Sequence, residues 1–212
     1  MFISMYRKIL FILFLFTLFS FEVFSQDLVK FDWGVFVKES KNSEILLKDP
    51  FIYNTESNSK FQLRFANRSN CFFYIYYLDS DNELYFLYPD KKGEKIDNLF
   101  NTIPGTEKWF EIEKNVNEEV LYFIASHRKL DNLVNLSQQY NKWVENGSDK
   151  MIKESKYEII NELKKLVLEN SQYKTIIEEA ALITSDTKSL KKEILKIEKE
   201  KLYVKTIVFK SK

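Results

Sequence analysis

Residues 61–89 read FQLRFANRSNCFFYIYYLDSDNELYFLYP, and this stretch decides the fold. Its hydrophobic pattern predicts three strands, at residues 61–66, 71–78 and 84–88. Apolar and polar residues alternate in the first strand. The second is apolar or aromatic on both faces, which is typical of a strand that is covered from both sides. Short polar turns separate the three strands, so we expect them to be antiparallel neighbours in one sheet.

Further strands are expected on both sides of this stretch. Residues 28–38 alternate between apolar and more polar positions, and Gly34 in the middle is typical of a bulge. Residues 109–113 and 120–125 predict two more strands that are joined by a polar turn. Residues 202–209 are β-branched and alternating, so they predict a last strand that returns to the sheet.

The spacing of apolar residues becomes helical after Ser126. It predicts helices near residues 130–144 and 152–167, with Gly147 as the cap between them. Residues 171–183 fit a helix better than a strand, and residues 188–201 predict a charged helix. Strands followed by helices and one strand indicate an α+β fold. We therefore expect an antiparallel β-sandwich-like core, with a helical segment at 127–201 before the last strand.

The first 25 residues have the features of an export signal. Arg7 and Lys8 are followed by a mostly apolar run of 13 residues, which is shorter than the roughly 20 residues of a spanning helix. Val-Phe-Ser at 23–25 fits a cleavage site before Gln26. We expect residues 26–212 to form one extracytoplasmic domain, periplasmic or secreted, without stable membrane insertion after cleavage. An uncleaved membrane anchor is the alternative.

Charge and cysteine content argue against nucleic-acid binding and against stabilisation by an internal disulfide. Without Arg7, Lys8 and Glu22, the 32 basic and 31 acidic residues become 30 and 30. This balanced and interspersed charge gives no electrostatic footprint for nucleic acid. Cys71 is the only cysteine. An exported domain with one thiol has no internal disulfide and must be stable by packing alone, with Cys71 as a small buried residue.

Two groups of polar residues resemble a metal site and a catalytic site, but neither pattern is complete. Asp79, Asp81 and Glu83 are spaced like the first ligands of a calcium loop, without the later Gly and Glu, so a polar hairpin turn is favoured. His127 is the only histidine, and Asp131 one helical turn later could orient it, but no nucleophile motif accompanies them. We predict no catalytic residue, no metal ligand and no cofactor.

The aromatic residues of the deciding stretch are too many for one face of a sheet. Tyr74, Tyr76, Tyr85 and Tyr88 are candidate binding residues on an aromatic face. Either the predicted helices cover this face, which we favour, or part of it is an exposed platform for a glycan or a protein.

The chain also resembles a known family. YIYYLDSDNELYFLYPD at 74–90 is followed by NLFNTIPG at 98–105, WFEIE at 109–113 and VLYFIAS at 120–126. This succession is similar to the bacterial family known as domain of unknown function 4384, over about residues 60–136. The chain departs where the family usually has Gly (Asp81-Asn82) and Asn (Asp90), but both changes are compatible with turns. The resemblance implies an extracytoplasmic, β-sandwich-like module, and it carries no catalytic residues across.

These observations together predict an exported, non-catalytic interaction module of the cell envelope or the secreted space. Its expected partner is a protein or a glycan. The alternative function is an envelope hydrolase that works through a carboxylate pair, because 30 acidic residues always offer some suitable spacing.

Overall fold

The computed structural model describes residues 27–38, 44–55, 59–89, 101–112, 118–184 and 191–211. The predicted signal peptide at 1–25 lies outside these ranges. Within them the fold is α+β and mostly β, with sheets of seven and five strands and the helices α2 (Asp131–Asn146) and α3 (Asp149–Asn170). No helix in these ranges is long and apolar enough to span a membrane.

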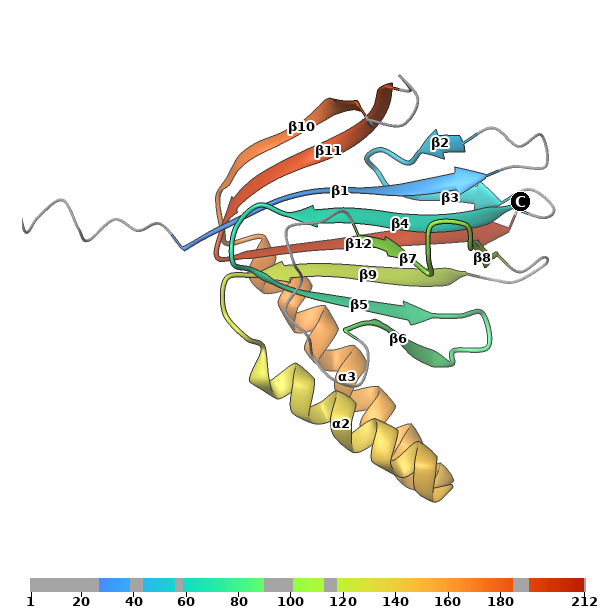
Figure 1. Cartoon of the computed structure of the whole chain (residues 1–212). Coiled ribbons are helices and arrows are strands. Elements are labelled where there is room, and N and C mark those ends of the chain that lie inside the picture. Colours follow the sequence, from blue (N-terminus) through green and yellow to red (C-terminus); the bar gives the residue numbers. More distant parts are fainter. Residues whose placement is uncertain are drawn as a thin grey trace, which may run out of the picture.

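The first sheet has the order β10-β11-β1-β4-β7, with β2 beside β1 and β8 beside β4. Its strands are β1 (Leu28–Lys38), β2 (Glu44–Leu46), β4 (Lys60–Asn67), β7 (Asn101–Ile103), β8 (Phe110–Glu111), β10 (Thr175–Thr184) and β11 (Lys191–Glu200). The second sheet has the order β3-β12-β9-β5-β6. Its strands are β3 (Ile52–Thr55), β5 (Phe72–Leu78), β6 (Leu84–Tyr88), β9 (Glu119–Ser126) and β12 (Leu202–Ser211). Both helices lie beyond the second sheet (Figure 1).

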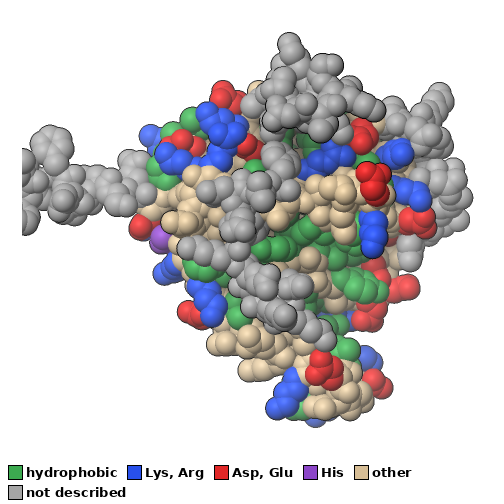
Figure 2. All heavy atoms as spheres, in the orientation of Figure 1, with side chains coloured by type: hydrophobic (Ala, Val, Ile, Leu, Met, Phe, Trp, Pro, Cys, Tyr) green, Lys and Arg blue, Asp and Glu red, His purple; other side chains and the backbone are tan. Residues whose placement is uncertain are grey.

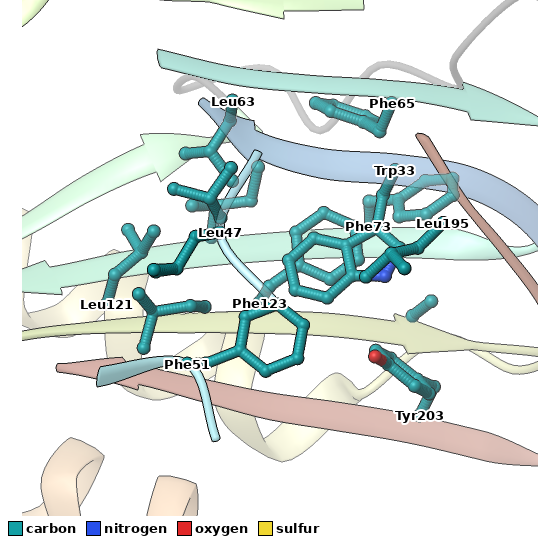
Figure 3. Packing of buried hydrophobic residues seen from close by; sticks show 14 of the residues in the cluster. Trp33, Leu47, Phe51, Leu63, Phe65, Phe73, Leu121, Phe123, Leu195 and Tyr203 are labelled. Atoms are coloured by element: carbon teal, nitrogen blue, oxygen red, sulfur yellow. The ribbon is translucent and has the colours of Figure 1, made fainter. Parts of the chain in front are cut away.

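An inner cluster of apolar side chains joins the two sheets. Trp33 of β1 stacks on Phe123 of β9 with 4.5 Å between ring centroids, and Phe31 meets Phe73 of β5 edge to face at 5.4 Å. Figure 3 shows Trp33 of the first sheet lying close to Phe73 and Phe123 of the second sheet. Each fully buried side chain of this size contributes roughly 1.5–3 kcal/mol. The largest members of the inner cluster are Phe31, Trp33, Phe51, Phe61, Phe65, Phe73, Tyr77, Phe123, Tyr203 and Phe209.

An outer cluster lies between the second sheet and the helices. The sheet contributes Tyr74, Tyr76, Leu84, Tyr122, Ile124, Leu202 and Val204, and the helices contribute Leu133, Tyr140, Ile159, Leu163 and Leu166. Strand β5 therefore supplies both clusters, with Phe73 and Ile75 on one face and Tyr74 and Tyr76 on the other. The prediction that both faces of this strand are covered, and that helices cover the second, is confirmed.

The prediction of one three-stranded unit at 61–89 is wrong. Strands β5 and β6 form the expected hairpin, but β4 belongs to the first sheet. The connection at 68–70 does not close a hairpin, because it is bonded to β1. The Arg68 amide donates to the Lys30 carbonyl at 2.9 Å, and the Lys30 amide donates to Ser69 Oγ at 2.9 Å. The strands predicted at 109–113 and 120–125 are not neighbours either, because β8 belongs to the first sheet and β9 to the second.

The helical segment predicted at 127–201 is correct only up to Asn170. Gly147 caps α2 in the left-handed conformation, with φ 66°, as expected. Beyond the helices, however, the chain forms the hairpin of β10 and β11, which we expected to be helical. Strand β11 also pairs with β1, and Leu195 and Ile197 alternate into the inner cluster. A helix in this place would lose both the backbone pairing and this burial.

Gly34 does not mark a bulge. The pairing of β1 with β4 continues through Gly34 opposite Arg64 without a shift. A Cβ atom on Gly34 would lie 2.8 Å from Leu46 Cδ1 and 3.0 Å from Phe36 Cε2. The glycine is therefore required by the close approach of β2 to β1, and a side chain here would force neighbours to move.

Candidate functional site

A polar pocket of about 180 Å³ lies where three connections meet: β9 to α2, α3 to β10, and β11 to β12. The side chains with a charge or a ring in its lining are Asp27, His127, Arg128, Glu169, Tyr173 and Lys201. In Figure 2 the histidine, in purple, lies on one flank of the molecule among acidic and basic side chains. Tertiary structure alone brings these residues together, because they come from four separate parts of the chain.

Backbone contacts of Lys201 fix one wall of the pocket. Lys201 has a φ of 51°, and its carbonyl oxygen accepts two hydrogen bonds of 3.0 Å, from the His127 amide and from His127 Nδ1. This contact requires a hydrogen on Nδ1. The Lys201 amide in turn donates to the Asp27 carbonyl at 2.6 Å. The first residue before β1 is thus tied to the β11–β12 turn and to the entrance of α2.

The orientation of His127 differs from the predicted one. His127 Nε2 lies 3.7 Å from Asp27 Oδ2, whereas Asp131 forms its ion pair with Lys129 at 3.4 Å. The Ser126 hydroxyl also lines the pocket, but it accepts a hydrogen bond from the Arg128 amide at 3.3 Å. In this described pocket the imidazole therefore contacts a carbonyl and a carboxylate, and the serine–imidazole contact of a catalytic triad is not formed.

Tyr173 and Glu169 form the opposite wall. The Tyr173 hydroxyl, just after α3, donates to Glu169 Oε1 in the last turn of that helix at 2.7 Å. This hydrogen bond, which the neutral phenol donates, raises the pKa of Tyr173. Lys201 Nζ lies 5.8 Å from the Tyr173 ring centroid, within the range of a cation–π contact. The wall therefore presents a ring, a carboxylate and an ammonium group side by side.

The four tyrosines that we predicted as binding residues from the sequence do not share one exposed face. Tyr74 and Tyr76 are each 3% exposed, and burial raises the pKa of both. The Tyr74 hydroxyl accepts a hydrogen bond from the Leu130 amide at 3.0 Å, and the Tyr76 hydroxyl lies 2.9 Å from Ser137 Oγ of α2. Tyr85 is 47% exposed, and Tyr88 packs against the inner cluster.

The other polar groups from the sequence have structural roles. Asp79 Oδ1 accepts hydrogen bonds from the amides of Asp81 (3.0 Å) and Glu83 (2.7 Å), so it stabilises the β5–β6 turn as predicted. Among the residues described, no three acidic, cysteine or histidine side chains are grouped so that they could hold a metal ion. Cys71 is buried, and burial raises its pKa to about 11, which is unlike a reactive thiol.

A second cluster of charges ties the β10–β11 hairpin to β12. Lys205 Nζ lies 3.1 Å from Asp49 and 3.3 Å from Glu178, and the Tyr203 hydroxyl donates to Glu178 at 3.4 Å. Burial of Lys199 on the neighbouring strand lowers its pKa. These charges neutralise one another between β10 of the first sheet and β12 of the second, so they hold the hairpin in place and do not form an open site.

Comparisons with family models, with curated proteins and with solved structures give no match for this chain. The resemblance to domain of unknown function 4384 therefore stays a prediction. The sequence had singled out one residue of the pocket, His127. Asp27, Glu169, Tyr173 and Lys201 carried no signal, because nothing in the local sequence shows that they meet.

Proposed function

We propose that this chain is an exported, non-catalytic module with a sandwich-like core, and that it binds a protein partner at the polar pocket. The composition of the pocket carries the proposal. Arg128 and Tyr173 are of the residue types that dominate binding energy at protein interfaces. Carboxylates from Asp27 and Glu169 lie beside them, so the surface offers charges of both signs to a partner.

The dimensions of the pocket favour binding over chemistry. Pockets that enclose cofactors and substrates usually measure roughly 300–1,000 Å³, and this one measures about 180 Å³. The Ser126 hydroxyl is already bonded to the Arg128 amide, and the His127 imidazole is already bonded to the Lys201 carbonyl. A catalytic site needs a nucleophile or base that faces a reacting atom. The pocket resembles one subsite of a larger contact surface.

A protein partner fits the tyrosines better than a glycan does. Sugar rings stack on open aromatic faces, but Tyr74 and Tyr76 are buried beneath the helices. The ring of Tyr173 is accompanied by the Lys201 ammonium group, at 5.8 Å from its centroid. A protein surface can pair with this ammonium group and with Glu169 at the same time.

Site-specific photocrosslinking in a bacterial host tests the proposal. The full-length chain would carry a photoreactive residue in place of Lys129, whose side chain is 56% exposed beside the pocket, so that Arg128 is kept. In a matched control the photoreactive residue replaces Tyr157, which is 68% exposed on α3. We expect a protein adduct of defined mass from position 129 and none from position 157. A second substitution, Lys201→Glu, should remove the adduct, whereas Lys164→Glu on the exposed side of α3 should not.

The same material tests export and the alternative functions. Intact mass of the protein from the envelope fraction should show a chain that begins at Gln26; retention of residues 1–25 would support an anchor. A glycan adduct in place of a protein would establish the glycan alternative. Release of envelope fragments by the purified protein, abolished in Glu169→Gln, would establish the hydrolase alternative and overturn the proposal.

A further inference from the structure

The polar pocket contains two basic side chains that have no acidic partner. Among the residues that the structure describes, neither Arg128 nor Lys201 forms an ion pair, although both line the pocket. The adjacent Lys129 does form one, with Asp131 at 3.4 Å. Figure 2 shows basic side chains beside the histidine on this flank of the molecule. The pocket therefore holds positive charge that no ion pair in the described part of the chain neutralises.

The two acidic side chains of the pocket are already in contact with other groups. Glu169 Oε1 accepts the hydrogen bond of the Tyr173 hydroxyl at 2.7 Å. Asp27 Oδ2 lies 3.7 Å from His127 Nε2. A negatively charged guest would meet two unpaired cations in the pocket, whereas a positively charged guest would have to share each carboxylate with the group that contacts it.

Both cations lie close to the ring of Tyr173. Lys201 Nζ is 5.8 Å from the ring centroid. The hydrogen bond to Glu169 raises the pKa of Tyr173, and the nearby positive charge of Arg128 acts in the opposite direction. Two cations from different connections, β9 to α2 and β11 to β12, thus meet at one ring. A carboxylate can accept hydrogen bonds from both, because each of its two oxygens has two lone pairs.

We propose that the pocket binds a carboxylate group of the protein partner, held between Arg128 and Lys201. This assignment rests on the proposed function, because it specifies which group of a protein partner enters the pocket. Carboxylates are the groups of an unmodified protein that carry negative charge at neutral pH. The pocket volume of about 180 Å³ corresponds to about six water molecules at about 30 Å³ each. This is room for a carboxylate, the carbon next to it and a few waters.

The single histidine provides a readout inside the pocket, because its ring belongs to the lining. The Hε1 resonance of His127 would be followed by NMR at one fixed pH while peptides are added to the purified protein. N-acetyl-trialanine has a C-terminal carboxylate, N-acetyl-Ala-Asp-Ala amide has a side-chain carboxylate, and N-acetyl-trialanine amide has neither. We expect a saturable shift with a carboxylate peptide, in the millimolar range because exposed ion pairs are weak, and none with the neutral amide. The peptide that binds more tightly identifies the chain end or the side chain as the source.

Matched substitutions test the two cations. Arg128→Gln and Lys201→Gln should each weaken binding of the carboxylate peptide about tenfold, because each removes a hydrogen bond to a charged group. Lys129→Gln removes the same charge from the neighbouring residue, whose ammonium group is paired with Asp131, and should leave binding unchanged. All three residues are exposed, so the variants should fold like the original chain, and circular dichroism checks this.

The outcomes separate the carboxylate site from the proposed function. Equal shifts with the neutral amide, equal losses in Arg128→Gln and Lys129→Gln, or tighter binding of inorganic phosphate than of either carboxylate peptide would overturn the carboxylate site. A photocrosslinked protein adduct from position 129 that persists in Arg128→Gln would also overturn it, while the proposed function would stand. Carboxylate binding that Arg128→Gln weakens, in a protein that gives no adduct, would support the site and contradict the protein partner.

Discussion

The two faces of β5 belong to two cores that are built differently. Phe73 and Ile75 enter the inner cluster, where rings and aliphatic chains pack between the sheets. Tyr74 and Tyr76 enter the outer cluster, and each hydroxyl is bonded to the segment that forms or leads into α2. Most of the inner cluster is packing between apolar side chains of the two sheets, whereas the hydrogen bonds of Tyr74 and Tyr76 in the outer cluster also position a helix.

This difference indicates that apolar packing supplies most of the stability of the fold, whereas the tyrosine hydrogen bonds fix the position of α2. Burial of apolar area is the larger energy term, and a single hydrogen bond contributes a net of roughly 0.5–1.5 kcal/mol. Changes in the inner cluster should therefore affect the whole fold. Loss of a tyrosine hydroxyl in the outer cluster should affect mainly how α2 is held.

Deletion of Leu202–Lys212 should have the largest effect. Strand β12 lies between β3 and β9 and supplies both clusters, with Tyr203, Ile207 and Phe209 in the inner one. Its loss removes more than the total stability of about 5–15 kcal/mol of a typical domain. We expect no cooperative thermal transition and strong binding of a hydrophobic dye. A shortened protein that keeps its sheet spectrum and melting temperature would show that the two cores are separable.

Truncation of Phe73 to alanine should cost about 3–5 kcal/mol of unfolding free energy. Phe73 is 3% exposed in the inner cluster, so the change leaves a cavity. Phe72→Ala is the matched control, because Phe72 is the neighbouring residue and is only partly buried, against the outer cluster. Urea denaturation measures both. Equal losses at the two positions would contradict the difference between the clusters.

The reactivity of the Cys71 thiol reports how well the inner cluster excludes water. Burial raises its pKa from 9.0 to about 11. Folding thus favours the neutral thiol, so this contribution to stability is complete below about pH 9 and is lost as the pH rises through about 11. At pH 8 the thiolate fraction is about 100-fold lower than in the unfolded chain, and alkylation should be slower by about that factor. Mass spectrometry with and without denaturant compares the rates; similar rates would place the thiol in water.

Removal of the Tyr76 hydroxyl should have the smallest effect. Tyr76→Phe loses one hydrogen bond to Ser137, whose hydroxyl also donates to the Leu133 carbonyl at 2.8 Å. We expect a loss of about 1 kcal/mol, with faster amide exchange confined to α2. Tyr157→Phe on the exposed side of α3 is the control and should change neither. A loss of several kcal/mol would mean that the hydroxyl bond, and not packing, holds the helices.

Strong local periodicity explains which elements could be predicted. Strand β1 has the predicted bounds, and the two helices lie close to the expected positions, because their apolar residues repeat every two or every 3.6 positions. The charged segment Lys191–Glu200 misled the prediction. Ile194 and Ile197 fit a helical spacing, but Leu195 and Ile197 also alternate, and pairing with β1 selects the strand.

The candidate site was much less predictable. His127 could be singled out because it is the only histidine. The assignment of its partner to Asp131 used local helical spacing. The structure places Asp27 beside the imidazole instead, a residue 100 positions away. Contacts over such distances leave no periodic trace in a single sequence.

The sequence by itself determined strand β1, the β5–β6 hairpin, the two helices, the aromatic richness of the core and the balance of charge. Tertiary structure alone decided that β4 and β5 enter different sheets, that Lys191–Glu200 is a strand, and that the polar pocket exists. The physical reason is one of magnitude. Local propensities differ by about 1 kcal/mol per residue or less, so pairing with β1 and the burial of Leu195 and Ile197 together outweigh them.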